Sequence, residues 1–271
     1  MRMPNFLVIG AAKAGTTAVY DYLGMHPQVF MTRLKETNFF ALEGSPLTFA
    51  GPGDDDCINK YSLTRLEEYA DLFRDARDEP AVGEASPLYL YASTAPERIR
   101  RYVPDARLIA VLRHPVERAY SAFLHTIRDG RESLHDFGLA LAAEESRIQS
   151  GWEHIWHYRN MGLYGEQLER YYSLFAPEQI RVFLYEDLVQ RPEEMLQECY
   201  QFLGVDDEYV PDMSIKPNVT TDVPAHMRPP LLPEVQAELT ASLHEDILRL
   251  ESLIGRDLSH WLRTAPVMQP A

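Results

Sequence analysis

Residues 5–20 read NFLVIGAAKAGTTAVY, and this stretch decides the fold of the chain. Phe6 to Ile9 form an apolar run without alternation, which is typical of a strand buried on both faces of a parallel sheet. Gly10 ends the run, and Gly15 precedes a segment with helical spacing. A strand, a glycine-bounded loop and a helix together direct backbone N–H groups at a phosphate. The stretch therefore predicts a phosphate-binding loop in an α/β protein, and the alternative is an ordinary strand-to-helix turn.

The position of the lysine separates this loop from that of nucleoside-triphosphate enzymes. Their loop reads G-x-x-x-x-G-K-[ST], with lysine directly after the second glycine. Here Thr16 occupies that position, and Lys13 lies inside the loop. The stretch resembles the loop P-K-[SAT]-G-T-T of sulfotransferases that use 3′-phosphoadenosine 5′-phosphosulfate (PAPS), with Ala12 in place of the proline. The resemblance implies that the following residues bind the 5′ end of this cofactor: Lys13, Ala14, Gly15, Thr16 and Thr17.

Composition and charge exclude several classes of protein. With 45% hydrophobic and 11% aromatic residues among 271, a globular chain is expected. The net charge of −15 opposes binding to nucleic acids or anionic membranes. No apolar run reaches the ~20 residues of a membrane span, and a first strand near residue 5 leaves no room for a signal peptide. Cys57 and Cys199 lack the pattern of a disulfide framework or a zinc site. We therefore expect a cytoplasmic protein without a bound metal.

Strands and helices alternate along the chain, which predicts one α/β domain over residues 1–271 with a P-loop-type fold. Its central, mainly parallel sheet would be flanked by helices and contain strands near 6–9, 28–31, 81–85, 107–112 and 180–185. The later helices are expected over 63–73, 96–102, 116–128, 134–149, 160–175, 192–203 and 233–254. Three segments lie outside this framework: a surface insertion at 43–60 with a solvated acidic tip at 54–56, an extended cofactor or substrate loop at 206–232, and a loose tail at 263–271.

A second motif, RHPVERAYS, occupies residues 113–121 directly after an expected strand. An arginine at the carboxyl end of a buried strand projects into the crevice where open α/β sheets bind ligands. Ser121 lies about two turns into the next helix, on a face that can point back towards Arg113. The spacing resembles the 3′-phosphate motif R-[DNH]-P-x(4)-[YS]-S of PAPS sulfotransferases. The resemblance assigns Arg113 and Ser121 to the 3′-phosphate, and the alternative is a surface arginine with an unrelated helix serine.

A third motif, KETNFF, covers residues 35–40. It resembles the E-x-x-F-F segment of heparan sulfate sulfotransferases and related bacterial enzymes, in which the glutamate is the general base. Glu36 takes that place, and a hydroxyl that attacks sulfur must lose its proton to such a group. The alternative for Glu36 is an exposed loop acid, in which case Glu84, His125 and His157 are the next candidates. Lys35 meets either the sulfonate, the acceptor or solvent.

The resemblance covers most of the chain, with two departures. Residues 83–89, GEASPLY, match E-K-[ST]-P-x-Y except at Ala85, which replaces a lysine that in heparan-type enzymes helps to hold an anionic polysaccharide. The C-terminal cofactor loop lacks a K-G-R or R-K-G run, and Lys216 or Arg228 would complete the 3′-phosphate site there.

The chain is therefore expected to be a PAPS-dependent sulfotransferase with Lys13 and Glu36 as catalytic residues. It would move a sulfuryl group to a hydroxyl, or less favourably an amine, of a small-molecule or glycan acceptor and release adenosine 3′,5′-bisphosphate. The negative net charge favours a neutral or weakly charged acceptor. Five residues offer aromatic surface for it, and the favoured alternative for each one singly is a place in the core: Tyr89, Tyr91, Trp152, Trp156 and Tyr158. Two alternatives remain open: a small-molecule kinase using ATP, with residues 182–187 imitating a Walker B strand, and a non-catalytic nucleotide-binding protein.

Overall fold

The computed structural model describes residues 2–213 and 228–263, and these residues cluster into two compact units. Unit 1 consists of residues 1–47, 61–112 and 170–218, and unit 2 of residues 48–60, 113–169 and 219–271. The organisation of residues 1–271 as one domain stays a prediction. Within the described ranges, no helix combines the length and the apolar character needed to span a bilayer.

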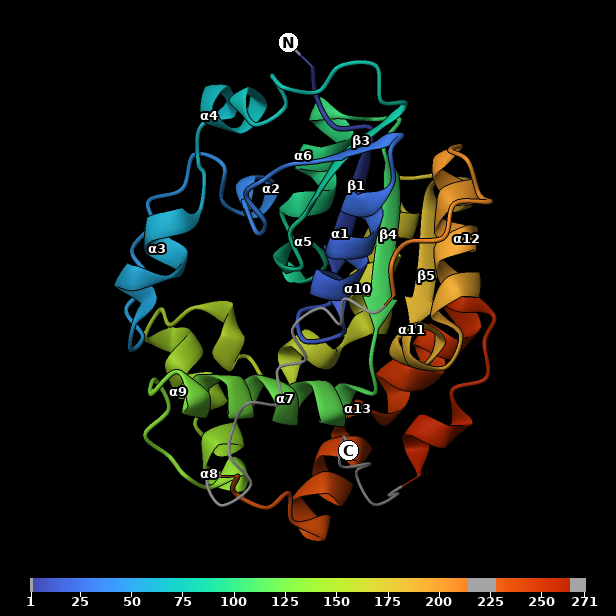
Figure 1. Ribbon diagram of the computed structural model, residues 1–271. Coiled ribbons are helices and arrows are strands. Elements are labelled where there is room, and N and C mark those ends of the chain that lie inside the picture. Colours follow the sequence, from blue (N-terminus) through green and yellow to red (C-terminus); the bar gives the residue numbers. More distant parts are fainter. Residues whose placement is uncertain (1, 214–227, 264–271) are drawn as a thin grey trace. The chain divides into compact units, whose positions relative to one another are not determined.

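Unit 1 is built on a five-stranded sheet in which every paired strand runs parallel to its neighbour (Figure 1). The strands are β1 (Phe6–Gly10), β2 (Val29–Met31), β3 (Ala81–Ala85), β4 (Arg107–Leu112) and β5 (Ile180–Leu184). Their order is β2-β3-β1-β4-β5, which places β1 at the centre. The predicted α/β fold with a parallel sheet is confirmed, because the buried apolar runs that indicated strands form this sheet.

Two helices, α1 (Thr16–Met25) and α12 (Pro192–Leu203), share an apolar core with one face of this sheet (Figure 1). Ala81 and Ala85 of β3 belong to that core. Successive side chains of a strand point to opposite faces, so Glu84 points to the other face. There the hydroxyl of Tyr69 donates to it from α4 (Leu66–Asp71). Unit 1 also contains α2 (Phe39–Leu42), α5 (Leu88–Tyr91), α6 (Ala95–Tyr102) and α11 (Tyr185–Gln190).

Unit 2 is helical and centres on α7 (Pro115–Arg128). This helix contacts α8 (Phe137–Ala142), α13 (Pro233–Ile254) and the short 3₁₀ turns at His154–Trp156 and Asn160–Gly162. The helix predicted over 134–149 is divided at Ala143 into α8 and α9 (Glu144–Gln149), and α10 (Tyr164–Tyr172) is shorter than predicted. The segment predicted to be an insertion contains a 3₁₀ turn at Asp54–Asp56 and α3 (Ile58–Tyr61).

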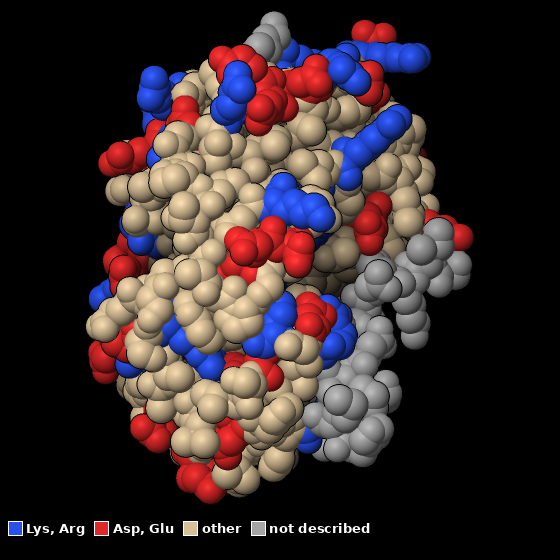
Figure 2. Space-filling model, turned by 90° about the vertical axis from the view of Figure 1, so that its left-hand side faces the viewer, with Lys and Arg blue, Asp and Glu red and all other residues tan. Residues whose placement is uncertain are grey.

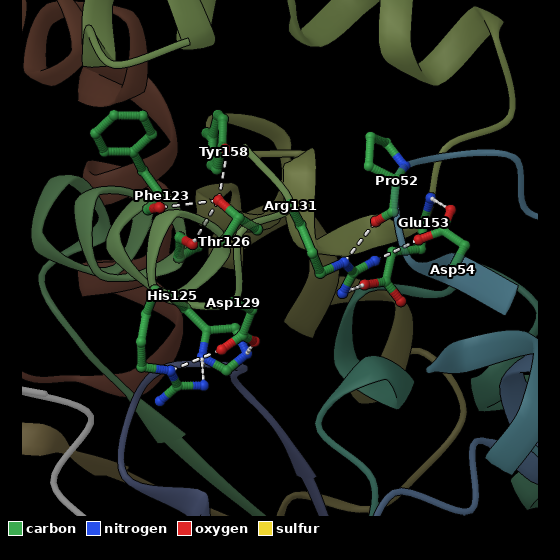
Figure 3. A network of polar contacts seen from close by, with 11 residues as sticks. Pro52, Asp54, Phe123, His125, Thr126, Asp129, Arg131, Glu153 and Tyr158 are labelled. Carbon is green, nitrogen blue, oxygen red and sulfur yellow. Dashed lines mark hydrogen bonds and ion pairs between the residues drawn. The ribbon is translucent and has the colours of Figure 1, made fainter. Parts of the chain in front are cut away.

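The expectation of a solvated acidic tip is wrong for Asp54, which is fully buried. Its carboxylate forms an ion pair with Arg131, and Nη1 of Arg131 lies 2.7 Å from Oε1 of Glu153 (Figure 3). Nε of Arg131 also donates to the carbonyl oxygen of Pro52 at 2.6 Å. Burial raises the pKa of Asp54, although two backbone N–H groups and the charge of Arg131 oppose that shift. The segment 48–60 is therefore anchored within unit 2 through a buried cluster of charges.

Candidate functional site

The loop at residues 10–17 connects β1 to α1 and is held in one shape. The N–H of Ala11 donates to the carbonyl oxygen of Val111 at 2.7 Å, which fixes the start of the loop beside the end of β4. Lys13 has φ 69°, in the left-handed region that residues with side chains rarely adopt. Gly15 has φ 90°, and a Cβ atom there would lie 2.6 Å from Cδ2 of Leu188. Position 15 therefore requires glycine, which explains why the motif contains one.

The N-terminus of α1 has the features of an anion-binding site. The helix begins at Thr16, so the N–H groups of its first turn have no acceptor within the helix. Its first turn, which lies wholly in the described part of the chain, contains no acidic residue. The positive end of the helix dipole is thus not neutralised by a carboxylate of the helix itself. These residues fit a phosphate group, and their assignment to the 5′ end of the cofactor stays a prediction.

Glu36 lies in the turn between β2 and α2. Its N–H donates to the carbonyl oxygen of Ala85 at 2.8 Å, and its φ is 61°. Its carboxylate forms an ion pair with Lys35, and 55% of the Glu36 side chain is exposed. The ammonium group of Lys35 lies beside this carboxylate, a contact that none of the three alternatives for Lys35 named, and its contact with the sulfonate or the acceptor stays a prediction. A carboxylate with this exposure is accessible to an acceptor molecule.

The proposed catalytic residues both lie beyond the carboxyl edge of the unit 1 sheet. Lys13 follows β1, and the backbone of Glu36 is hydrogen-bonded to Ala85, the last residue of β3. Because β1 and β3 are parallel neighbours, their carboxyl ends lie at the same edge. That edge is where open α/β sheets bind their ligands.

The motif predicted to hold a 3′-phosphate belongs to unit 2, directly after β4 in the chain. Nη2 of Arg113 lies 3.0 Å from Oε2 of Glu117, and Tyr164 donates its hydroxyl to the carbonyl oxygen of Arg113 at 3.1 Å. Glu117 and Ser121 are four residues apart in α7 and therefore lie on one helix face. Sequence reasoning missed Glu117, although its spacing of four residues from Arg113 was a signal for this ion pair.

The basic residue that completes this motif was predicted in the C-terminal loop. Lys216 lies outside the described residues. Arg228 belongs to the described residues. Burial has the larger effect on the pKa of Tyr120 and raises it, whereas the positive charge of Arg228 lowers that pKa. The hydroxyl of Tyr120 donates to the carbonyl oxygen of Pro229, so Arg228, the preceding residue, lies close to the residue next to Ser121 and is a candidate for this basic group.

The three alternative bases occupy different environments. Glu84 is fully buried, and burial raises its pKa to about 7. Burial lowers the pKa of His157 to about 4. Nε2 of His125 lies 3.4 Å from Oδ2 of Asp129, and its Nδ1 lies 2.9 Å from Nη2 of Arg128 (Figure 3). Of these groups, Glu84 is the one in unit 1, on the strand whose last residue anchors Glu36.

Burial and contacts decide between two pairs of alternatives. Tyr89, Trp156 and Tyr158 are fully buried, so for these three residues the alternative of a place in the core holds, and they form no aromatic surface for an acceptor. The carboxylate of Asp187, proposed as an imitation of a Walker B acid, accepts the N–H of Leu184 at 2.9 Å. It also lies 3.0 Å from Arg191 and is thereby committed to the start of α11.

Comparison with known proteins identifies relatives of the chain. Residues 3–216 match the family described as Sulfotransferase domain. The crystal structure of a sulfotransferase from Alicyclobacillus acidocaldarius is 40% identical in sequence and has a TM-score of 0.88, covering 97% of this chain and 100% of that chain. The sulfotransferase domain from the curacin biosynthetic pathway is 17% identical with a TM-score of 0.56, covers 95% of this chain and 100% of that chain, and shares the fold.

The curated relatives align with this chain over only part of their own length. Bifunctional heparan sulfate N-deacetylase/N-sulfotransferase 3 of Mus musculus is 28% identical over 218 residues, which are 77% of this chain and 23% of that protein. Heparan sulfate glucosamine 3-O-sulfotransferase 6 of Homo sapiens is 28% identical over 205 residues, 75% of this chain and 53% of that protein. The chain thus spans between about a quarter and about half of the length of these relatives.

Proposed function

Because the chain belongs to the sulfotransferase family, we propose that it transfers a sulfuryl group from PAPS to a hydroxyl group of a small or carbohydrate-like acceptor. The observation that carries this proposal is the loop at 10–17, in which Lys13 lies before the glycine at the start of α1. The kinase alternative is not favoured, because the family match points to sulfuryl transfer and Asp187 is used within its own helix.

The 5′-phosphosulfate is proposed to lie at the N-terminus of α1. Backbone N–H groups at Gly15, Thr16 and Thr17, with the two threonine hydroxyls, would bind its oxygens. The N–H of Ala14 donates to the carbonyl oxygen of Ala11, so Ala14 would shape the loop beside the phosphate. The ammonium group of Lys13 would neutralise negative charge on the bridging oxygen as the S–O bond breaks. That stabilisation grows in the transition state, so it raises turnover more than it tightens binding.

The proton of the acceptor hydroxyl is proposed to pass to Glu36. The exposure of this carboxylate and its position beyond the same sheet edge as Lys13 support the assignment. Lys35 would keep the carboxylate ionised and oriented before the acceptor binds. Arg113 and Ser121 would hold the 3′-phosphate, and Arg228 is a candidate to join them. Lys216, the other candidate for this role, lies outside the described residues.

The proposed acceptor class draws on two relatives that are named for heparan sulfate and its glucosamine. A carbohydrate acceptor is what these relatives share, because one is named as an N-sulfotransferase and the other as a 3-O-sulfotransferase. A hydroxyl stays the acceptor group that we propose, and an amine is the less favoured one. Cys57 and Cys199 are both free, as in a reducing compartment, so we also propose the cytoplasm as the location.

Ligand binding tests the cofactor. Adenosine 3′,5′-bisphosphate should raise the melting temperature in the presence of a metal chelator, and by more than ATP does. Tighter binding of ATP that depends on Mg²⁺ would instead support the kinase.

Two substitutions test the catalytic roles. Lys13→Ala and Glu36→Gln should each lower turnover of PAPS by about 10²-fold or more, the usual effect of losing an electrostatic stabiliser or an acid–base group. Both variants should keep the melting temperature of the wild type within a few degrees. If Glu36→Gln keeps near-normal turnover with a good acceptor, another group is the base.

A further inference from the structure

The turn that carries Glu36 has an unusual backbone. Glu36 has φ 61° and Asn38 has φ 55°, so two residues with side chains adopt the left-handed region on either side of Thr37. Such conformations persist when the surrounding structure determines them. The contacts that hold this turn therefore decide where the Glu36 carboxylate lies.

Three hydrogen bonds anchor the backbone of this turn. The N–H of Glu36 donates to Ala85 O at 2.8 Å, and the N–H of Leu63 donates to Thr37 O at 2.8 Å. The third bond joins the N–H of Asn38 to the side chain of Ser86, whose Oγ accepts it at 3.1 Å. Of the three, the Asn38 bond is the one that ends on a side chain, so a substitution can remove it.

The acceptor role of Ser86 fixes the direction of the next bond. Asn38 N–H can only donate, so the single proton of the Ser86 hydroxyl is available for another acceptor. Oγ of Ser86 lies 2.8 Å from Oε2 of Glu84 and 3.3 Å from Oγ1 of Thr37. The carboxylate is the nearer and the stronger acceptor. A chain of two bonds thus leads from the turn through Ser86 to Glu84.

Glu84 is fully buried, and hydroxyl groups supply its partners. Tyr69 of α4 donates to Oε1 at 3.2 Å, and Tyr89 of α5 also hydrogen-bonds the carboxylate. The charge of Lys35 acts on it from the turn. A buried carboxylate is costly unless its bonds are satisfied. Glu84 is costly to bury, and it is linked through Ser86 to the turn that carries Glu36. These two observations together indicate that Glu84 positions this turn.

We propose that Glu84 is a positioning residue for sulfuryl transfer, which acts through Ser86 to hold the turn that carries Glu36. The inference rests on the proposed role of Glu36 as the base. The bond from Ser86 is stronger when Glu84 is ionised, because a charged acceptor strengthens a hydrogen bond. The carboxylate thereby orients Glu36 although it touches neither PAPS nor the acceptor.

Ser86→Ala and Tyr69→Phe form a matched pair for the first test. Each variant removes one hydroxyl that donates to Glu84, but only Ser86 also accepts the Asn38 N–H. We expect Ser86→Ala to lower kcat by about 10-fold or more with KM for PAPS within about 2-fold, the effect of misplacing a reacting group. Tyr69→Phe should keep kcat near the wild-type value. Ser86→Thr keeps the hydroxyl, so its kcat should also lie near the wild-type value and not near that of Ser86→Ala. Equal losses of kcat in Ser86→Ala and Tyr69→Phe would overturn the proposal.

A double variant tests whether Ser86 acts through Glu36. In the Glu36→Gln background, Ser86→Ala should change kcat by less than about 2-fold, because the group that Ser86 positions is already inactive. A full additional loss would overturn this inference and leave the proposed base intact. Wild-type turnover by Glu36→Gln itself would overturn both the assignment of Glu36 as the base and this inference. The proposed transfer of a sulfuryl group from PAPS would not be affected by that result.

Glu84→Gln supplies a readout that does not depend on how Ser86→Ala folds. The amide keeps an acceptor for Ser86 but does not ionise. The pKa of Glu84 is about 7, raised by burial and lowered by the hydroxyls of Tyr89, Ser86 and Tyr69. The wild-type kcat should therefore fall by about 5-fold as the pH falls from about 8 to about 6, down to a value that Glu84→Gln shows throughout this range. An unchanged acid limb in Glu84→Gln would contradict the proposal.

Discussion

At the scale of single residues, backbone strain coincides with the proposed chemistry. In residues 2–213 and 228–263, the non-glycine residues with positive φ are Lys13, Glu36 and Asn38. Strained conformations tend to occur at functional sites, where the surrounding contacts hold them in place. The sequence predicted Lys13 and Glu36 from motifs. It could not predict the role of Asn38, because Ser86, which holds its backbone, lies 48 residues away.

The burial of Glu84 predicts a dependence of stability on pH. Its pKa is raised from 4.5 to about 7 in the folded protein, so the folded state binds a proton that the unfolded state has released between these values. The free energy of unfolding of the wild type should then decrease, relative to Glu84→Gln, as the pH rises from about 4.5 to about 7. The decrease should be at most about 3 kcal/mol, the free energy of this shift in pKa.

Urea denaturation of both proteins at several pH values measures this difference. Above pH 7 the difference should become constant, since Glu84 is ionised in both states there. Parallel curves for the two proteins between pH 5 and pH 7 would show that Glu84 has an ordinary pKa. The expected loss is the cost of keeping an ionised carboxylate at a position that supports activity.

At the scale of elements, the position of Arg113 between β4 and α7 leads to a prediction about binding of the 3′-phosphate. Arg113→Ala should weaken binding of adenosine 3′,5′-bisphosphate by about 10-fold or more, because a charge-assisted contact with phosphate is lost. Binding of adenosine 5′-monophosphate, which lacks the 3′-phosphate, should stay within about 2-fold. Arg128→Ala replaces the last residue of α7 and removes its ion pair with Asp129. It is the control variant and should bind both nucleotides as the wild type does.

Isothermal titration of the three proteins with both nucleotides separates these outcomes. An equal loss of affinity for the two nucleotides in Arg113→Ala would show that Arg113 supports the fold of the site and not the 3′-phosphate. Loss of binding in Arg128→Ala would show a general effect of positive charge on α7.

A second prediction at this scale concerns the buried cluster around Arg131 (Figure 3). Arg131→Met should lower the free energy of unfolding by about 3–5 kcal/mol, because it leaves the buried carboxylates of Asp54 and Glu153 without their cation. Arg128→Met, which removes a more exposed ion pair with Asp129, should cost at most about 1 kcal/mol.

Urea denaturation and hydrogen exchange of residues 48–60 measure the effect of Arg131→Met. Neutralising both carboxylates in the triple variant Asp54→Asn, Arg131→Met, Glu153→Gln should recover part of the lost stability, because no buried charge is then left alone. A loss in Arg131→Met no larger than that in Arg128→Met would mean that the cluster contributes little.

The elements also show why one part of the fold was predictable and another was not. The strand at 107–112 was found from its buried apolar run, because local sequence determines that pattern. The break between α8 and α9 occurs at Ala143, a good helix former, so packing and not propensity decides it. The burial of Asp54 depends on Arg131, which lies 77 residues further along the chain. Contacts of that separation leave no local signal.

At the scale of the whole molecule, the net charge of the chain indicates which acceptors it can bind. The net charge of −15 repels a polyanion in the absence of a basic groove. On the face shown in Figure 2, Lys and Arg side chains lie interspersed with Asp and Glu side chains. Ala85, at the position where heparan-type enzymes have a lysine, is fully buried in the apolar core of unit 1. A lysine there would point into that core, so this segment is not built to hold an anionic polysaccharide.

We therefore predict a neutral or weakly charged hydroxylated acceptor, such as a glycoside or a glycolipid. PAPS-dependent sulfation of heparosan, measured beside a panel of neutral glycosides, tests this prediction. At saturating PAPS, neutral compounds should be sulfated at a rate that changes little with ionic strength, because binding an uncharged acceptor involves no charge to screen. Heparosan should be a poor substrate at low salt, where repulsion is strongest, and improve as salt is added. The opposite result, efficient turnover of heparosan that salt inhibits and no turnover of the neutral panel, would require a basic groove that outweighs the net charge.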